Sequence, residues 1–217
     1  HRVDRRQRQM CIRDSNMTVQ PQISMVVMDQ STGYVKGIVG GRGEKTESLS
    51  LNRATDTTRQ PGSTFKVVAA YAAALDSAGM TLATTQYDAP YNYNGGKGRP
   101  VRNWNGENYQ GWTSLRKGIE QSMNIVAVKT ITDITPALGI NYLKNMGITT
   151  MQEELKNGKN DYTQAMVLGG ITNGIKNVEL TAAYATIANG GVYEKPVFYT
   201  RILDHDGNVL IDNTEGY

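Results

Sequence analysis

The feature that most constrains the fold is the run from Gln60 to Leu75, in which Lys66 is the only charged side chain. The residues after Lys66 are almost all Val, Ala, Tyr and Leu. A helix with this sequence is apolar on every side, so we expect it in the interior of the protein. Burying an amine costs free energy unless the amine has partners. Lys66 is therefore the first candidate functional residue.

Ser63 precedes Lys66 by three residues and directly follows a Pro-Gly turn, in the pattern Ser-x-x-Lys. Residues three apart on a helix share a face, so the two side chains can approach each other. A Ser hydroxyl becomes a good nucleophile when a base takes its proton, and Lys is such a base when its pKa falls well below about 10.4. Burial and the positive end of a helix both lower that pKa. The pattern predicts Ser63 as nucleophile and Lys66 as its base.

The same pattern recurs at Ser114 and Lys117, where the sequence favours a structural role. Thr113 or Ser114 can cap a short helix, and Lys117 then belongs to a solvated face. Only Ser63 has a Gly turn before it and a long apolar run after it.

Composition limits the classes of function that the chain can have. A length of 217 residues suggests one domain or a large part of one. Residues 1–17 carry a net charge of +3 and the other residues are neutral overall. We interpret 1–17 as a disordered or non-native tail. No nucleic acid partner is expected, because no basic stripe with interleaved aromatic residues is present.

The residue types available for catalysis are also limited. The only cysteine, Cys11, lies in the tail, and the two histidines, His1 and His205, are far apart in the sequence. A Cys nucleophile, a His-based triad and a zinc site are therefore not expected. We expect neither a metal nor a cofactor. Catalysis would use Ser, Lys, Tyr, Asn or carboxylates.

The order of predicted elements is strands, then mostly helices, then strands, which indicates an α+β fold with helices against an antiparallel sheet. A hairpin is expected from Gln22–Asp29 and Tyr34–Val39, and another around Asp206-Gly207. The stretch 81–111 lacks helix signals and is either a binding surface, a lid or an ordinary surface excursion. Trp112 is assigned to the core. Helices are expected at 113–121, 125–131, 136–146 and 178–188, the last capped by Asn177.

Two further segments carry polar or glycine residues in short patterns. Ser122 and Asn124 stand just before an apolar helix, and on their own they would be interpreted as its caps. The segment Leu168–Gly174, with sequence LGGITNG, suits either a tight structural turn or the rim of a site.

Four segments together resemble the transpeptidase domain of class A penicillin-binding proteins: RAT from Arg53, RQPGSTFK from Arg59, QSMN from Gln121 and LGGITNG from Leu168. The likeness runs from about Thr18 to the end. It implies a partial penicillin-binding or serine β-lactamase-like fold, with an antiparallel sheet and a helical subdomain around a buried central helix. The family's third motif, Lys-Thr-Gly, occurs nowhere in the sequence. Residues 18–217 are therefore expected to be the N-terminal part of the domain.

The resemblance implies a role for each matching residue. Ser63 would attack the penultimate D-alanine of a peptidoglycan stem peptide and form an acyl-enzyme, with Lys66 accepting its proton. Ser122 would relay a proton to the leaving D-alanine. Penicillins and other β-lactams would acylate the same serine. Substrate-binding positions would be Asn124, Gly169, Gly170 and Thr172.

The resemblance also implies a parent protein on the extracytoplasmic side of a bacterial cell membrane, with an upstream glycosyltransferase domain. No run in this sequence has the length of a membrane span, and none has the pattern of a signal peptide. Because the third motif is missing, we expect poor labelling of the 217-residue chain by a fluorescent penicillin.

Two alternatives remain at this point. One is a serine β-lactamase-like hydrolase, for which Glu153 gives only a faint match to the deacylating carboxylate of one class. The other is a non-catalytic module that binds β-lactams or stem peptides.

Overall fold

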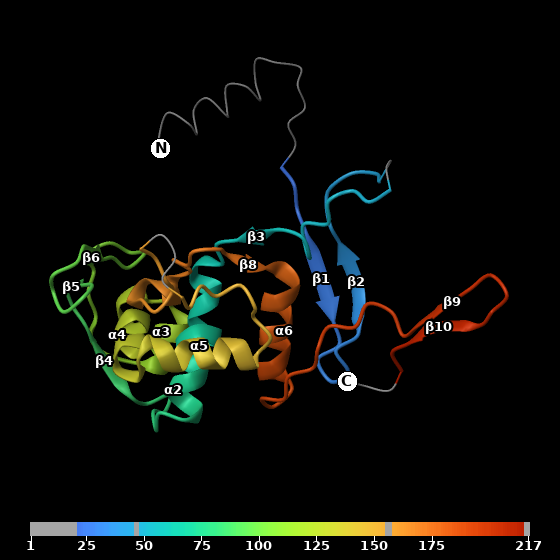
Figure 1. Ribbon diagram of the computed structural model, residues 1–217. Coiled ribbons are helices and arrows are strands. Elements are labelled where there is room, and N and C mark those ends of the chain that lie inside the picture. Colours follow the sequence, from blue (N-terminus) through green and yellow to red (C-terminus); the bar gives the residue numbers. More distant parts are fainter. Residues whose placement is uncertain (1–20, 46–47, 155–157, 215–217) are drawn as a thin grey trace, which may run out of the picture.

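The computed structural model describes residues 21–45, 48–154 and 158–214. The expected tail, residues 1–17, lies outside this range. A central helical run stands upright in the middle of the molecule, with other helices on both sides of it (Figure 1). The helices are η1 Gly62–Thr64, η2 Val67–Tyr71, α2 Ala72–Asp76, α3 Leu115–Glu120, α4 Asn124–Ile134, α5 Pro136–Asn145, η3 Gln164–Leu168 and α6 Asn177–Ala188.

The central run is the predicted apolar helix, and its interior position is confirmed. Phe65, Val68, Ala69 and Ala70 have no exposed surface. The run is not one regular α-helix, however. It begins as the 3₁₀ turn η1, is α-helical at Phe65 and Lys66, continues as the π-helix η2 and returns to α-helix in α2. The wide π turn directly follows Lys66.

The backbone of α5 touches the π turn at Gly139. A Cβ atom at this position would lie 2.4 Å from the carbonyl oxygen of Ala69. Since no side chain can occupy that space, only glycine permits this approach. Four core residues of α4 and α5 complete the packing around the run: Ile125, Ile131, Ile140 and Leu143.

The strands form two-stranded antiparallel pairs rather than one sheet within the described residues. The pairs are β1 Met25–Met28 with β2 Val35–Val39, β3 Thr58–Arg59 with β8 Ile175–Lys176, β4 Thr85–Asp88 with β7 Gly111–Ser114, β5 Tyr91–Asn92 with β6 Pro100–Val101, and β9 Arg201–Leu203 with β10 Val209–Asp212. The α+β class and the antiparallel pairing are confirmed, and in this part of the chain the strands stand as separate pairs.

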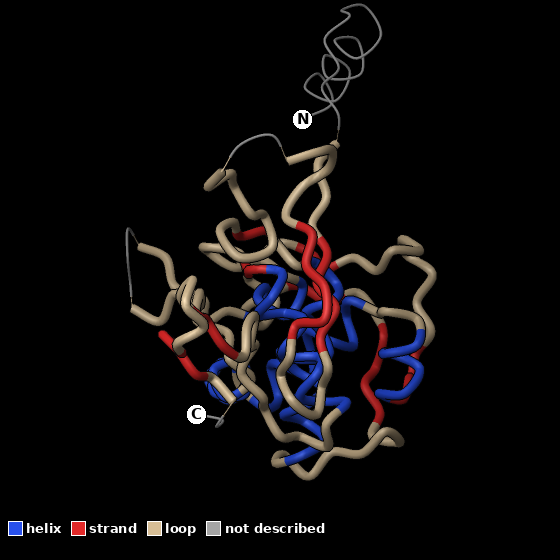
Figure 2. Tube along the Cα trace, turned by 90° about the vertical axis from the view of Figure 1, so that its right-hand side faces the viewer, coloured by secondary structure: helices blue, strands red, loops and turns tan. Residues whose placement is uncertain are grey.

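The predicted first hairpin is confirmed as β1–β2, with Met25 opposite Val39. It stands at the edge of the molecule, and α6 packs against β1 (Figure 1). Figure 2 shows the hairpin in front of the helices. Asn177 is not the cap of α6, contrary to expectation, because Lys176 occupies the N-cap position. The Asn177 amide instead donates to the carbonyl oxygen and the hydroxyl of Ser24, at 3.1 and 3.0 Å, and so ties α6 to the start of β1.

The stretch 81–111 is more ordered than its sequence suggests, because it contains β4, β5 and β6. Its strand β4 pairs with β7, which places Tyr87 opposite Trp112. The two rings lie 5.2 Å apart, and Trp112 is 74% exposed. Assigning Trp112 to the core was therefore wrong. Neighbouring residues of a strand face opposite sides, and Thr113 takes the buried side.

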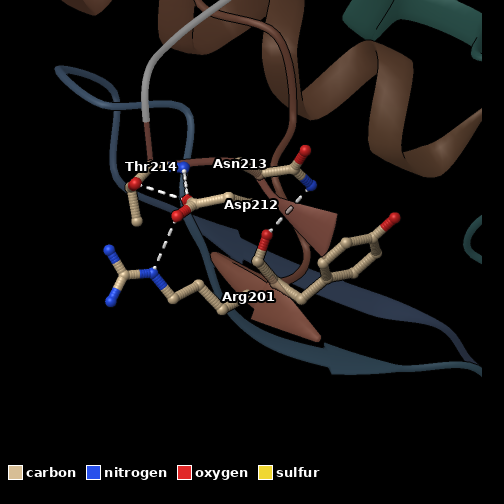
Figure 3. A network of polar contacts seen from close by, with 5 residues as sticks. Arg201, Asp212, Asn213 and Thr214 are labelled. Atoms are coloured by element: carbon tan, nitrogen blue, oxygen red, sulfur yellow. Dashed lines mark hydrogen bonds and ion pairs between the residues drawn. The ribbon is translucent and has the colours of Figure 1, made fainter. Parts of the chain in front are cut away.

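The C-terminal hairpin β9–β10 confirms the prediction around Asp206-Gly207 and projects from the body (Figure 1). Figure 3 shows how its base is held. The Asp212 carboxylate accepts hydrogen bonds from Arg201 Nε at 3.0 Å and from the backbone N–H of Thr214 at 2.8 Å. The amide of Asn213 donates to the carbonyl oxygen of Tyr199 at 3.3 Å.

The second Ser-x-x-Lys pattern has the structural role predicted for it. Ser114 is the N-cap of α3, and its hydroxyl accepts the backbone N–H of Lys117 at 3.3 Å. Lys117 is exposed. Across the described helices, none combines the length and hydropathy that a membrane crossing requires.

The contact of α5 with the π turn gives a test of the fold. We expect Gly139→Ala to lower the free energy of unfolding by about 1–3 kcal/mol, because the new methyl group meets the Ala69 carbonyl oxygen. Gly37→Ala is the matched control, since a Cβ there has open space. Urea unfolding followed by circular dichroism measures both. Equal stability of the two variants would contradict the close approach.

Candidate active site

The side chain of Lys66 is only 2% exposed, and its amine is surrounded by oxygen atoms. Nζ donates to the carbonyl oxygen of Ser122 at 2.6 Å, to the Ser122 hydroxyl at 3.0 Å and to Oδ1 of Asn124 at 2.5 Å. Lys66 and Asn124, which are 58 positions apart in the sequence, are thus joined by a hydrogen bond. The structure brings together three of the predicted site residues, Lys66, Ser122 and Asn124.

Burial lowers the pKa of Lys66 from its ordinary value to about 8. The direction and the cause agree with the sequence-based prediction. At pH 7 roughly a tenth of the Lys66 side chains are then neutral, and the fraction is about half at pH 8. The three oxygen acceptors match the three N–H bonds of an ammonium group, so they favour the charged form. Burial and hydrogen bonding therefore act on this amine in opposite directions.

Ser122 has a left-handed backbone conformation, with φ of 50°. This conformation costs a non-glycine residue about 1–2 kcal/mol. Backbone hydrogen bonds hold the turn: Ser122 donates to Ile119 at 3.1 Å and Met123 donates to Gly118 at 2.9 Å. In this conformation the carbonyl and hydroxyl oxygens of Ser122 both lie within hydrogen-bonding distance of the Lys66 amine. A strained residue whose strain serves a specific contact is a mark of a functional site.

Neither Ser122 nor Asn124 caps α4, so the structural interpretation of these two residues is wrong. Met123 is the N-cap residue, and its side chain makes no cap hydrogen bond. Oδ1 of Asn103 instead accepts the backbone N–H groups of Asn124 and Ile125, at 2.9 and 3.1 Å. Sequence reasoning missed Asn103, because an Asn in an Asn- and Gly-rich stretch carries no distinguishing signal.

Ser63 is the middle residue of η1 and is exposed. Its hydroxyl has no hydrogen-bond partner among the described residues, so it does not contact the Lys66 amine through a hydrogen bond. Two contacts fix the turn around it: the Thr64 hydroxyl donates to the Pro61 carbonyl, and the Tyr184 hydroxyl donates to the Thr64 carbonyl, both at 2.6 Å. Ser63 is therefore held on a fixed turn at the surface of the protein.

The glycine-rich segment packs directly behind that turn. Gly169 ends η3 with φ of 81°, and a Cβ atom there would lie 2.3 Å from the backbone nitrogen of Gly62. Gly170 is exposed. The predicted site residue Thr172 bonds inward: its N–H and hydroxyl donate to Oδ1 of the buried Asp161, at 2.8 and 2.7 Å.

Gln60 joins the glycine-rich segment to the same turn and was also missed from the sequence. Its side-chain amide donates to the carbonyl oxygen of Ile171 and accepts the Ile171 N–H at 3.2 Å. The Ser63 turn is thus fixed by its internal hydrogen bond, by Tyr184 of α6 and by residues 169–171. Within the described ranges, no group of His, Cys, Asp and Glu side chains could hold a metal ion.

The lowered pKa of Lys66 predicts how stability depends on pH. Its pKa is about 8 when folded and about 10.4 when unfolded, so the unfolded state binds the extra proton between these values. The stability of the chain should therefore rise by about 1–3 kcal/mol from pH 8 to pH 10.4 on account of Lys66. Urea unfolding at several pH values should show this rise in the wild type and in Lys117→Met. The rise should be absent in Lys66→Met, and its persistence there would contradict the assignment.

Comparison with known proteins identifies the family. Residues 23–215 match the family model described as penicillin binding protein transpeptidase domain. The chain is 33% identical over 210 residues to penicillin-binding protein 1A of Clostridium tetani, covering 93% of this chain and 26% of that protein. It is 33% identical over 205 residues to penicillin-binding protein 1A of Clostridium botulinum, covering 91% and 24%. The chain thus spans about a quarter of the length of these relatives.

Solved structures agree with this match. Penicillin-binding protein 1A from Haemophilus influenzae superposes with a TM-score of 0.70 at 29% identity, covering 88% of this chain and 27% of that one. PonA1 from Mycobacterium tuberculosis superposes with a TM-score of 0.74 at 22% identity, covering 98% and 54%, and so supports the fold. Family model, relatives and fold agree, and the chain belongs to the transpeptidase domain family of penicillin-binding proteins.

Proposed function

We propose that this chain carries the nucleophile and proton-transfer residues of a peptidoglycan D,D-transpeptidase. The observation that carries the proposal is the buried Lys66 amine, which bonds to both Ser122 and Asn124 beside the exposed Ser63 turn. Membership of the transpeptidase family supports the reaction class. A similar solved structure, PonA1 of Mycobacterium tuberculosis, is described as a complex with penicillin V.

In the proposed reaction Ser63 Oγ attacks the carbonyl carbon of the penultimate D-alanine, and the neutral Lys66 amine takes the hydroxyl proton. The C–N bond to the terminal D-alanine then breaks. Its amine leaves with a proton from the Ser122 hydroxyl, which the Lys66 ammonium replaces over their 3.0 Å hydrogen bond. An amine of a second stem peptide then attacks the ester carbonyl, the C–O bond to Ser63 breaks, and the proton that the amine loses returns to Ser63 Oγ as the amide cross-link forms.

The other predicted residues would shape the binding site. Asn124 is proposed to bind a substrate amide, although in this structure its oxygen serves Lys66. Gly169 and Gly170 would form the rim beside the Ser63 turn. Thr172 holds that rim in place through Asp161. Stem peptides and β-lactams are the proposed partners of the same serine.

The cellular setting is proposed from family membership alone. The parent protein would be attached to a bacterial cell membrane, with this domain on the extracytoplasmic side and a glycosyltransferase domain upstream. Penicillin-binding proteins of type 1A, to which this chain is similar, are the basis for this proposal.

The hydrolase alternative is disfavoured by the surroundings of Glu153. Its carboxylate forms an ion pair with Lys144 at 2.9 Å and accepts the Tyr162 hydroxyl at 2.9 Å. These two bonds lower the pKa of Glu153 and occupy both of its oxygens. It is therefore poorly suited to activate a water molecule at Ser63.

Fluorescent penicillin tests the proposal. A protein that extends this chain through a Lys-Thr-Gly strand should be labelled at Ser63. Ser63→Ala should abolish labelling, whereas Ser114→Ala should leave it unchanged. Because burial lowers the Lys66 pKa to about 8, the rate should rise nearly tenfold per pH unit below that value and level off above it. Equal labelling of Ser63→Ala would overturn the assignment.

The contact between Gly169 and Gly62 gives a second test with the same reagent. We expect Gly169→Ala to slow labelling by tenfold or more, because the methyl group would displace the turn that carries Ser63. Gly207→Ala is the matched control. It has a similar positive φ of 86° but open space at the Cβ position, so only backbone strain is added. If both variants label at the same rate, the glycine-rich segment does not position Ser63.

A further inference from the structure

Asn103, which bonds the backbone N–H of Asn124, belongs to a buried polar network that the proposed reaction does not use. Asn103 is 5% exposed and Asp88 is 1% exposed. Nδ2 of Asn103 donates to Asp88 Oδ1 at 2.8 Å, and Asp88 Oδ2 accepts the backbone N–H of Gln110 at 2.9 Å. Both buried side chains thus have partners on each side, which is the usual condition for keeping such groups in an interior.

The N-terminus of α4 requires this network. The first N–H groups of a helix have no partner within the helix, and a thioether at the N-cap position cannot replace the missing oxygen. Met123 stands there, so the N–H groups of Asn124 and Ile125 would be unsatisfied in the interior. Oδ1 of Asn103, 21 residues earlier in the chain, accepts both of them.

The orientation of the Asn103 amide is determined by Asp88. Asp88 Oδ1 accepts a hydrogen bond from the NH₂ group of Asn103, so this group faces Asp88. The carbonyl oxygen of the same amide must then face α4. A flipped Asn103 would present its donors to the N–H groups of the helix and lose every bond.

Asn124 is held by the same segment at two points. Its backbone N–H donates to Asn103 Oδ1 at 2.9 Å, and its side-chain Nδ2 donates to the Arg102 carbonyl oxygen at 2.7 Å. With the amide nitrogen fixed in this direction, Oδ1 of Asn124 points to Lys66 Nζ. The chain of contacts from Asp88 to the Lys66 amine is continuous.

We propose that Asn103, oriented by Asp88, is a positioning residue that fixes Asn124 and thereby one of the three acceptors of the Lys66 amine. The consequence for acylation rests on the proposed function, whereas the positioning itself does not. Within the stretch 81–111, Asp88, Arg102 and Asn103 would accordingly hold Asn124 in its position.

Asn103→Leu tests the proposal, because it keeps the branched shape of the side chain and removes its hydrogen bonds. Leu143→Ala is the control for lost stability, since Leu143 is a core residue of α5 rather than a neighbour of the α4 N-terminus. NMR of the 217-residue chain gives two readouts: hydrogen exchange at the amides of residues 124 and 125, and the titration of Lys66 followed at its ¹³Cε.

In Asn103→Leu we expect the two amides to exchange at least tenfold faster than in Leu143→Ala. We also expect the Lys66 pKa to fall further below about 8, because the ammonium loses the oxygen of Asn124. An unchanged titration, or a rise toward the ordinary lysine value, would overturn the proposal and leave Asn103 a structural cap.

A reciprocal exchange provides the rescue. Asp88→Asn alone loses one of the two bonds at position 88, because its NH₂ group must face a donor, either Asn103 Nδ2 or the Gln110 N–H. Asn103→Asp alone places two carboxyl groups face to face. In the double variant Asn at 88 donates to Asp at 103 and still accepts from Gln110, so every bond is restored. We expect slow exchange of the residue 124 and 125 amides in the double variant and exchange at least tenfold faster in Asn103→Asp, with Asp88→Asn between them. Fast exchange in the double variant as well would contradict the network.

The outcome can be separated from that of the proposed function. If the extended wild-type protein is not acylated at Ser63, the function fails, while the amide and Lys66 readouts still decide the positioning. If it is acylated, Asn103→Leu should slow acylation at least tenfold relative to Leu143→Ala at a temperature where both are folded. Equal rates would overturn the catalytic consequence.

Discussion

The site depends on one buried amine among three oxygens. Lys66 is the single charge within an apolar run, and the protein compensates its burial with two oxygens of Ser122 and one of Asn124. Burial pulls the pKa down to about 8, whereas the acceptors retain the proton. An amine balanced in this way can both take a proton from one hydroxyl and return it to another near neutral pH, which is what a two-step acyl transfer requires.

The geometry around this amine is set mainly by backbone conformation. Ser122 accepts a left-handed conformation so that its carbonyl and hydroxyl oxygens converge on one point. Gly169 lacks a side chain where its backbone meets the backbone of Gly62. Gln60 makes a two-point contact with Ile171. Such contacts leave little freedom to the turn that carries Ser63, and the close approach explains why position 169 is a glycine.

The sequence was sufficient for the parts of the molecule that have strong local patterns. The apolar run predicted the buried central helix and the unusual lysine, and the motifs around Ser63 and Ser122 predicted which segments meet. The contribution of Asn103 could not be predicted, because a cap supplied from 21 residues away leaves no local periodicity. Trp112 was misplaced because aromatic character suggests burial, whereas the alternation of β7 turns it outward. The π turn within the predicted apolar helix could not be foreseen, because no propensity scale distinguishes it from an α turn.

That π turn links the orientation of the site to the packing of the core. A π turn accommodates one more residue than an α turn, and one residue of an α-helix corresponds to about 100° of rotation. The wide turn at residues 67–71 therefore adjusts the phase between Ser63 and Lys66 on one side and the apolar face of α2 on the other. In a continuous α-helix, the direction of Lys66 relative to the apolar face of α2 would differ by about 100°. Either the apolar side chains would pack in the core or Lys66 would point to Ser122, but not both.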